Sequence, residues 1–471
     1  MDIQKMTEQT ADRLRDESRY SGFCESFSLP NSLAELHETA LALWKNGTPI
    51  SVSAGRTGIC GACCPRGGHL LSTEKLDKIL GFCPNENGFS LTAEPGVRLS
   101  QLLDFCRQNS AALGGCTLLP NPSETLATLG GLFSCNARGG NSRLHGDFAA
   151  AVLGLKILSP KGEMLELSRG ERFFLDSGVD LIDLFAGSEG MLGIVTELTL
   201  ALKKPAAELW GALFFFDENP SALAFGDAII ARFESDKNAA VRLGALEYFD
   251  KTAMELVNAH KKFVSALAPL PDFPKASNAA LYLELEGENA DEIQASLCAL
   301  LEEFEALGGR ESDALAASSK DECEKFRLLR HAVPEAVNAE IDRARLSDAR
   351  ICKLCSDFEL PELSFAELFD LYSRPLSESG LRGTIFGHAA SKRLHFNLLP
   401  SCFEDFLAGK KLLLELAEQI FQEGHAPGFE NGIGKTKKEI FKTLGGSRRE
   451  ILLAAKEFFD PQGLLNPGNM F

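Results

Sequence analysis

Short runs of apolar residues alternating with polar ones dominate the chain between about residues 49 and 205. Such runs predict β-strands, here over 49–54, 89–96, 154–159 and 194–202, with a helix over 99–115. After residue 205 the apolar runs lengthen, and several are followed by stretches with helical periodicity. There the pattern predicts strands over 209–216, 243–249 and 280–287 and helices over 292–309 and 366–376. We therefore expect an α+β protein with two sheet-containing parts.

Helical patterns are expected at both ends of the chain. Residues 1–40 predict a helix and a linker, followed by a helix that stops at Gly47, and the tail predicts helices over 437–445 and 450–460. The expected organisation has four segments: N-terminal helices (1–48), a glycine-rich sheet domain (49–205), a second domain with helices on one face of its sheet (206–425), and a C-terminal helical segment (426–471).

Composition narrows the possible functions. A hydrophobic fraction of 45% is ordinary for a soluble protein, and no run approaches the roughly 18–20 apolar residues of a membrane span. The polar N-terminus lacks the features of a secretory signal, so we expect a cytoplasmic protein. A net charge of −18 argues against a nucleic-acid partner, because phosphate binding needs a basic face.

The 13 cysteines, an odd number in a long chain, indicate reduced thiols rather than a disulfide framework. They cluster as CGACC at 60–64 and CKLC at 352–355. A zinc or iron–sulfur site usually needs four well-spaced ligands, and the two clusters lie far apart in sequence. Small buried thiols are the preferred interpretation, with a metal or redox site as the alternative.

Three glycine-rich runs are candidate ligand sites. In residues 53–68, glycines surround Arg56 directly after a strand, an arrangement that lets backbone N–H groups crowd a diphosphate. Residues 120–140 combine Gly130 and Gly131 with short hydrogen-bonding side chains that suit a flat polar ring system. Residues 185–200 place further glycines before a strand and could alone be an ordinary connection.

Together these runs resemble the FAD-binding domain of the vanillyl-alcohol oxidase / p-cresol methylhydroxylase (PCMH) superfamily. The matching stretches read AGRTGICGA, PNPSETLATLGGLFSCNARGG, GSEGMLGIVTE and, at 459–471, FDPQGLLNPGNMF, where Asn469 replaces the usual lysine. The resemblance spans about residues 49–471. It implies a two-part PCMH-type FAD-binding domain plus a cap domain with an antiparallel sheet covered by helices. Because no histidine stands in the first loop, we expect non-covalent FAD.

The resemblance assigns the FAD contacts to residues of these four stretches. They are Gly55, Arg56, Thr57, Gly58, Gly61, Pro120, Ser123, Thr128, Gly130, Gly131, Ser134, Asn136, Glu189, Gly190, Gly193, Ile194 and Asn466.

Within the superfamily the chain looks like the branch of D-lactate, glycolate and D-2-hydroxyglutarate dehydrogenases. In that branch two histidines of one element help to hold a divalent metal, and a later element contains a glutamate; GHAASKRLHFN at 387–397 and GFENG at 428–432 resemble these two elements. The implied ligands of Zn or Mn are His388, His395 and Glu430. Seven positions apart on one strand, the histidines would face opposite ways, so the insert between them must turn the chain. Core or surface histidines are the alternative.

Two further residues follow from the same resemblance. Arg330, in FRLLRHAVPEAV, stands where the family binds the substrate's carboxylate, although a helix-surface arginine would look the same. Asn431 replaces the histidine usually proposed as the base, and an amide cannot take a proton. His388, Arg330 and Asn431 are thus the expected catalytic positions. Lys353 is a weaker candidate.

The stretch PGFENGIGKT at 427–436 also has the ending of a nucleotide phosphate loop, but Gly428 comes one residue too early. We favour the metal-site interpretation.

The resemblance implies an FAD-dependent dehydrogenase that oxidises a D-2-hydroxy acid by hydride transfer to flavin. Its expected electron acceptor is a quinone, an electron-transfer flavoprotein or an iron–sulfur subunit, and its location is cytoplasmic or peripheral at the inner membrane. The changed motifs leave two alternatives: a flavin-binding subunit with reduced catalysis, and a superfamily oxidase or synthase, such as the alkyl-dihydroxyacetonephosphate synthases.

Overall fold

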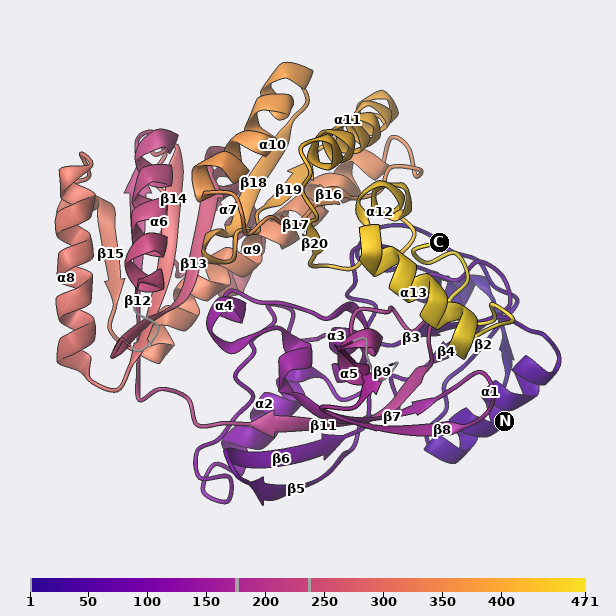
Figure 1. Cartoon of the computed structure of the whole chain (residues 1–471). Helices are drawn as coiled ribbons and strands as arrows, with labels where there is room; N and C mark the ends of the chain where they lie inside the picture. The colour runs from indigo at the N-terminus through magenta and orange to yellow at the C-terminus, as the bar shows by residue number, and fades with distance from the viewer. Residues whose placement is uncertain (1, 174–177, 236–238) are drawn as a thin grey trace. The chain divides into compact units, whose positions relative to one another are not determined.

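The computed structural model describes residues 2–173, 178–235 and 239–471 (Figure 1). The chain divides into two compact units. Unit 1 contains residues 1–139, 145–205 and 429–471, and unit 2 contains residues 140–144 and 206–428. The short elements α4 (Ser142–His145) and β20 (Gly428–Phe429) stand where the chain passes from one unit to the other. Unit 1 is therefore built from both ends of the chain.

A small sheet carries the N-terminal part of unit 1. Its strand order is β1 (Gln4–Lys5), β2 (Ser26–Ser28), β4 (His69–Ser72), β3 (Ile50–Ser53). Helix α1 (Leu33–Lys45) begins at Ser32, whose side chain accepts from the N–H of Glu35, and its apolar face packs against Ile50 and Leu71. This burial explains why the predicted second helix forms.

The helix expected near the start of the chain is present only as a short 3-10 helix. The structure has the two-residue strand β1 and a 3-10 segment, Glu8–Leu14, in which no residue is buried. A segment that is polar on all sides has no apolar stripe to pack, so packing does not stabilise a longer helix there.

The larger sheet of unit 1 has five antiparallel strands. Their order is β5 (Ile79–Asn85), β6 (Gly88–Ala93), β11 (Ile194–Leu202), β7 (Val152–Leu158), β8 (Met164–Ser168). The unit also contains α2 (Leu99–Gln108), α3 (Leu129–Cys135), β9 (Arg172–Phe173), β10 (Val179–Asp180), α5 (Leu181–Phe185), α12 (Lys438–Leu444) and α13 (Gly446–Phe459). The expected strands over 89–96, 154–159 and 194–202 thus form neighbours in one sheet.

Unit 2 is built on one antiparallel sheet of seven strands. Their order is β15 (Ala314–Ala317), β12 (Glu208–Phe216), β14 (Ala279–Gly287), β13 (Val241–Asp250), β18 (Gly383–His388), β19 (His395–Leu398), β16 (Leu354–Ser356). Its helices are α6 (Asn219–Glu234), α7 (Lys251–His260), α8 (Ala290–Ala306), α9 (Lys320–Arg345), α10 (Phe365–Ser379) and α11 (Phe403–Gln422), and the short strand β17 covers Phe358–Glu359. The expected α+β class is confirmed.

Helices cover both faces of this sheet, which corrects the expectation of one covered face (Figure 1). Alternate residues of β12 show the reason. Leu213 and Phe215 belong to the core that includes α7 and α9, whereas Phe214 and Phe216 pack against the ring of Phe225 of α6. A strand whose consecutive side chains are all apolar must be buried on both faces.

Candidate functional site

The first two glycine-rich runs lie side by side in unit 1. A Cβ placed on Gly55 would lie 3.3 Å from the carbonyl oxygen of Leu126, so the two loops approach through their backbones. Gly55, Gly58 and Gly131 are all exposed although they border a buried core. This leaves a cradle of backbone without side chains, which fits the flat ring system and diphosphate of FAD.

Other glycines of these runs serve the packing of unit 1 itself. A Cβ on Gly130 would lie 2.7 Å from Pro95, one on Gly193 would lie 2.3 Å from Ile157, and one on Gly190 would lie 2.6 Å from the amide of Asn466. The close approach of chain to chain requires glycine at these three positions. Contacts of Gly130, Gly190 and Gly193 with FAD remain a prediction.

Glu189 has a structural role that the sequence did not reveal. Its carboxylate accepts hydrogen bonds from the backbone N–H groups of Ile433, at 2.5 Å, and Gly434, at 2.8 and 3.0 Å. Burial raises the pKa of this carboxyl group, while the two backbone donors favour its ionised form. Two backbone N–H groups of the stretch 427–436, which also has the ending of a phosphate loop, therefore bind the carboxylate of Glu189, a side chain of the same unit.

Asn466 joins the same segments. Its side-chain NH₂ donates to the carbonyl of Glu189 at 2.6 Å, and its side-chain oxygen accepts from Val52 at 2.7 Å. The C-terminal signature thereby connects strand β3 to the third glycine-rich run.

The remaining predicted cofactor residues are distributed over the same loops. Thr128 caps helix α3 by accepting from the N–H of Gly131, and Asn136 ends that helix in a left-handed conformation with φ 48°. Arg56 lies 3.3 Å from Glu74, so its charge is shared with a neighbouring carboxylate. The rest of the set lies on the three runs or at the start of β11: Thr57, Gly61, Pro120, Ser123, Ser134 and Ile194.

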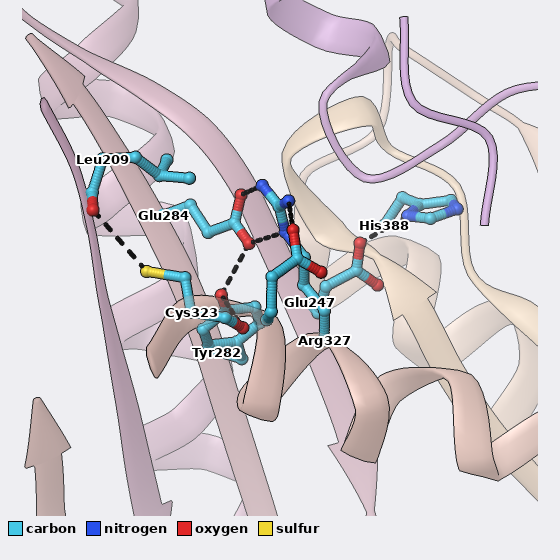
Figure 2. Close-up of polar contacts among 8 residues, drawn as sticks. Leu209, Glu247, Tyr282, Glu284, Cys323, Arg327 and His388 are labelled. Atoms are coloured by element: carbon cyan, nitrogen blue, oxygen red, sulfur yellow. Dashed lines mark hydrogen bonds and ion pairs between the residues drawn. The ribbon is translucent and has the colours of Figure 1, made fainter. Parts of the chain in front are cut away.

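In unit 2, helix α9 presents two arginines one turn apart to two buried carboxylates. Arg327 forms a bidentate ion pair with Glu284 of β14, with N···O distances of 2.5 and 2.6 Å (Figure 2). The hydroxyl of Tyr282 donates a hydrogen bond to the same carboxylate. Arg330 donates from Nε to Glu247 of the adjacent strand β13 at 2.7 Å. The predicted substrate-binding arginine is thus a buried residue of the interior rather than a surface one.

Glu247 joins Arg330 to His388. The Nδ1–H of His388 donates to the other oxygen of the Glu247 carboxylate at 2.6 Å (Figure 2). Burial by itself opposes ionisation, but His388 and Arg330 together lower the pKa of Glu247 to about 2. An ionised carboxylate only accepts, so the proton of this hydrogen bond lies on Nδ1 and the ring's Nε2 faces away from Glu247.

The expected turn between the two histidines is present. His388 ends β18, a 3-10 turn covers Ala389–Ser391, and His395 begins β19. The two imidazole centroids lie 5.2 Å apart. The hairpin therefore brings together two of the three predicted metal ligands within unit 2. Glu430, which is buried, and Asn431 belong to unit 1, and their parts in the site stay predictions.

Sequence reasoning missed Glu247. A single acidic residue in the otherwise apolar run 243–249 was the available signal, because an isolated charge in a strand buried on both faces needs partners. Arg393 was missed as well. It lies in the turn between the histidines and is 2% exposed.

Comparisons with known proteins agree with this geometry. Residues 25–168 match the family model described as FAD binding domain, and residues 225–470 match that of FAD linked oxidases, C-terminal domain. The chain is 29% identical to D-2-hydroxyglutarate dehydrogenase of Xanthomonas citri pv. viticola, over 95% of this chain and 89% of that protein. It is 28% identical to D-lactate dehydrogenase of Anaerostipes hadrus, over 90% and 85%.

Among solved structures the chain resembles p-cresol methylhydroxylase with substrate bound. The TM-score is 0.73 at 15% identity, covering 99% of this chain and 93% of that one. This likeness supports the fold alone. In the part of the chain that the structure describes, no helix is both long enough and apolar enough to span a membrane.

We expect Glu189→Ala to lower the free energy of unfolding by about 2–4 kcal/mol, because two buried N–H groups lose their acceptor. Glu189→Gln keeps an acceptor oxygen and should lose less. Thermal unfolding of both variants measures the difference, with Glu86→Ala on an exposed turn as the matched control. Equal melting temperatures for Glu189→Ala and the unmodified protein would contradict this role.

Proposed function

The chain belongs to the FAD-linked oxidases, and from this premise we propose that it is a dehydrogenase of a D-2-hydroxy acid of the lactate, glycolate or 2-hydroxyglutarate type. That it is an oxidoreductase using FAD follows from its family. The observation that carries the finer proposal is the buried set Arg330, Glu247 and His388 beside His395. It provides a fixed cation and a fixed imidazole in one small region.

Arg330 binds the carboxylate of the substrate in this proposal. Its Nε is engaged by Glu247, which leaves the two terminal nitrogens of the guanidinium as the donors for a second carboxylate. The ring of Phe386 lies beneath the guanidinium, with its centroid 5.0 Å from Cζ. The side chain is therefore held on two sides, so binding substrate costs little further ordering.

His388 and His395 face the hydroxyl of the substrate. In this proposal Nε2 of His388 binds the metal or the substrate, while Nδ1 donates to Glu247 and fixes the orientation of the ring. Two imidazoles with a carboxylate suit Zn or Mn, and Glu430 is the proposed third ligand. Such a metal would lower the pKa of the substrate's hydroxyl.

FAD, when bound to the loops of unit 1, accepts the two electrons removed from the substrate. The hydroxyl proton must leave to another group, and Asn431 cannot take it. This substitution favours a substrate or a rate that differs from those of the relatives. A quinone, an electron-transfer flavoprotein or an iron–sulfur subunit would then reoxidise the protein.

The proposal predicts which compounds bleach the bound flavin. Anaerobic mixing with a panel of D- and L-2-hydroxy acids should reduce the flavin with at least one D-acid at least tenfold faster than with its L-enantiomer. Stopped-flow absorbance of the flavin measures the rate. A protein that carries FAD but is reduced by no member of the panel would overturn the substrate class and favour a flavin-binding subunit.

Arg330→Lys should raise KM for the acid and lower kcat/KM by roughly 10–100-fold, because a planar fork of donors is replaced by a point charge. Arg327→Lys is the matched control. It stands one turn away, is also paired to a buried carboxylate, and should lower the melting temperature while leaving KM within about threefold. Equal kinetic effects of the two variants would remove Arg330 from substrate binding.

Removal of metal should separate substrate chemistry from cofactor binding. Chelation is expected to abolish flavin reduction by substrate while the flavin absorbance remains, and Zn or Mn should restore it. His395→Ala should behave like the chelated protein. His260→Ala, on helix α7, should not. Full activity of a protein proved free of metal would mean that the histidines bind the substrate directly.

A further inference from the structure

The cysteine-rich loop 60–64 lies under an N-terminal segment of the same unit. Arg15 and Ser21 pair across a short loop, and Phe23 pairs with Arg66 just beyond the cysteines. The fit is close, because a Cβ on Gly22 would lie 2.3 Å from the carbonyl oxygen of Pro65. This contact brings side chains from the start of the chain onto the loop that also carries Gly55 and Gly58.

Three potential metal ligands meet at this contact. A carboxylate oxygen of Asp16 and the sulfurs of Cys63 and Cys64 all lie within 4.8 Å of one another. Asp16 is 4% exposed and Cys64 is fully buried, while Cys63 is half-buried. Asp16 and Cys64 thus close the cluster off from solvent on one side, whereas solvent reaches it at Cys63.

We propose that Asp16, Cys63 and Cys64 bind one thiophilic divalent cation of the zinc class. The cation fastens the N-terminal segment to the loop that forms the diphosphate side of the FAD cradle. This site is separate in residues and in ligand chemistry from the histidine site of unit 2.

The spacing suits such an ion. Zinc bonds of about 2.3 Å to sulfur and 2.0–2.2 Å to oxygen place tetrahedral ligands roughly 3.4–3.8 Å apart. The observed upper limit is about 1 Å larger, and rotation of the half-buried Cys63 side chain can close that gap. Water or a small anion completes the fourth position from the reachable side.

The carboxylate is already oriented. One oxygen of Asp16 accepts from the N–H of Gly61 at 2.8 Å, and the other accepts from the N–H of Ser18 at 3.0 Å and from its hydroxyl. The oxygen that accepts from Gly61 retains a lone pair for a cation. Outer hydrogen bonds of this kind fix the direction of a metal-binding carboxylate.

The surrounding charge permits the exchange of protons for metal. Lys435 donates hydrogen bonds from Nζ to the carbonyls of Gly61 and Ala62 at 3.3 Å, which places an amino group beside the cluster. Binding of a dication with loss of the two thiol protons leaves the net charge unchanged. The thiol of Cys64, which donates to the carbonyl of Tyr20 at 3.3 Å, supplies one of those protons.

Cobalt(II) and cadmium(II) titrations test the proposal, because thiolate–metal charge-transfer absorption reports sulfur ligands and ignores the histidine site. Reduced, metal-free holoprotein should develop this band and saturate at no more than two equivalents per chain, because the histidine site also takes up metal, and zinc should displace it. Asp16→Asn should weaken binding by about 10–100-fold. Cys63→Ser/Cys64→Ser should lack the band, whereas Cys60→Ala, a buried neighbour outside the ligand set, should keep it.

The His388→Ala/His395→Ala variant should also keep the band, which separates this site from the proposed active site. Loss of the metal should speed FAD release from the native protein, measured by flavin fluorescence, but not from the Cys63→Ser/Cys64→Ser variant. If the double cysteine variant does not fold, Asp16→Asn carries the test. No band after two equivalents of metal per chain, an unchanged band in both variants, or a vicinal disulfide with no metal uptake after reduction would overturn the proposal.

Discussion

Arg330 and His388 both contact the carboxylate of Glu247 and together favour its ionised form inside a covered sheet. Leaving one member of a buried ion pair unpartnered costs about 3–5 kcal/mol, so this contact constrains everything around it. The register of the sheet places Glu247 directly opposite His388 on β18. The ion pair on the other side fixes the rotation of helix α9. The position of the histidine hairpin therefore follows from the need to satisfy one buried charge.

A second pair reinforces this constraint. Glu284 lies opposite Ala245, two residues from Glu247 along β13, so both carboxylates point to the same face of the sheet. Arg327 and Arg330 stand three residues apart on α9 and meet these carboxylates one by one. Helix α9 cannot shift along its axis without breaking both ion pairs, so the position of Arg330 along the sheet is fixed. A guanidinium that is meant to bind a substrate carboxylate benefits from such preorganisation.

The strands could be predicted from the sequence, but the ion-pair partners of Glu247 could not. Apolar runs such as 209–216 and 280–287 predicted strands correctly, because burial of consecutive side chains is a local property. Glu247 is 83 residues from Arg330 and 141 residues from His388, and no local pattern encodes such pairings. The segment near the start of the chain illustrates the same limit. Glu8–Leu14 has no buried residue, and the pairing that ties the chain just after it to the unit, between Phe23 and Arg66, is not local in sequence.

Glycine-rich runs illustrate a further limit, since one residue type answers two physical needs. Gly193 and Gly130 permit close packing of chain segments, whereas Gly55 and Gly131 leave exposed backbone for a ligand, and the sequence shows only glycine in each case.

The cysteines raise a related problem. The spacing of CGACC argued against four ligands from cysteine alone, but a carboxylate 47 residues before Cys63 changes the chemistry of the loop. Two thiolates with one carboxylate select a thiophilic ion, whereas two imidazoles with one carboxylate accept Zn or Mn. Manganese therefore distinguishes the two proposed sites, because it suits the second ligand set and binds weakly to the first.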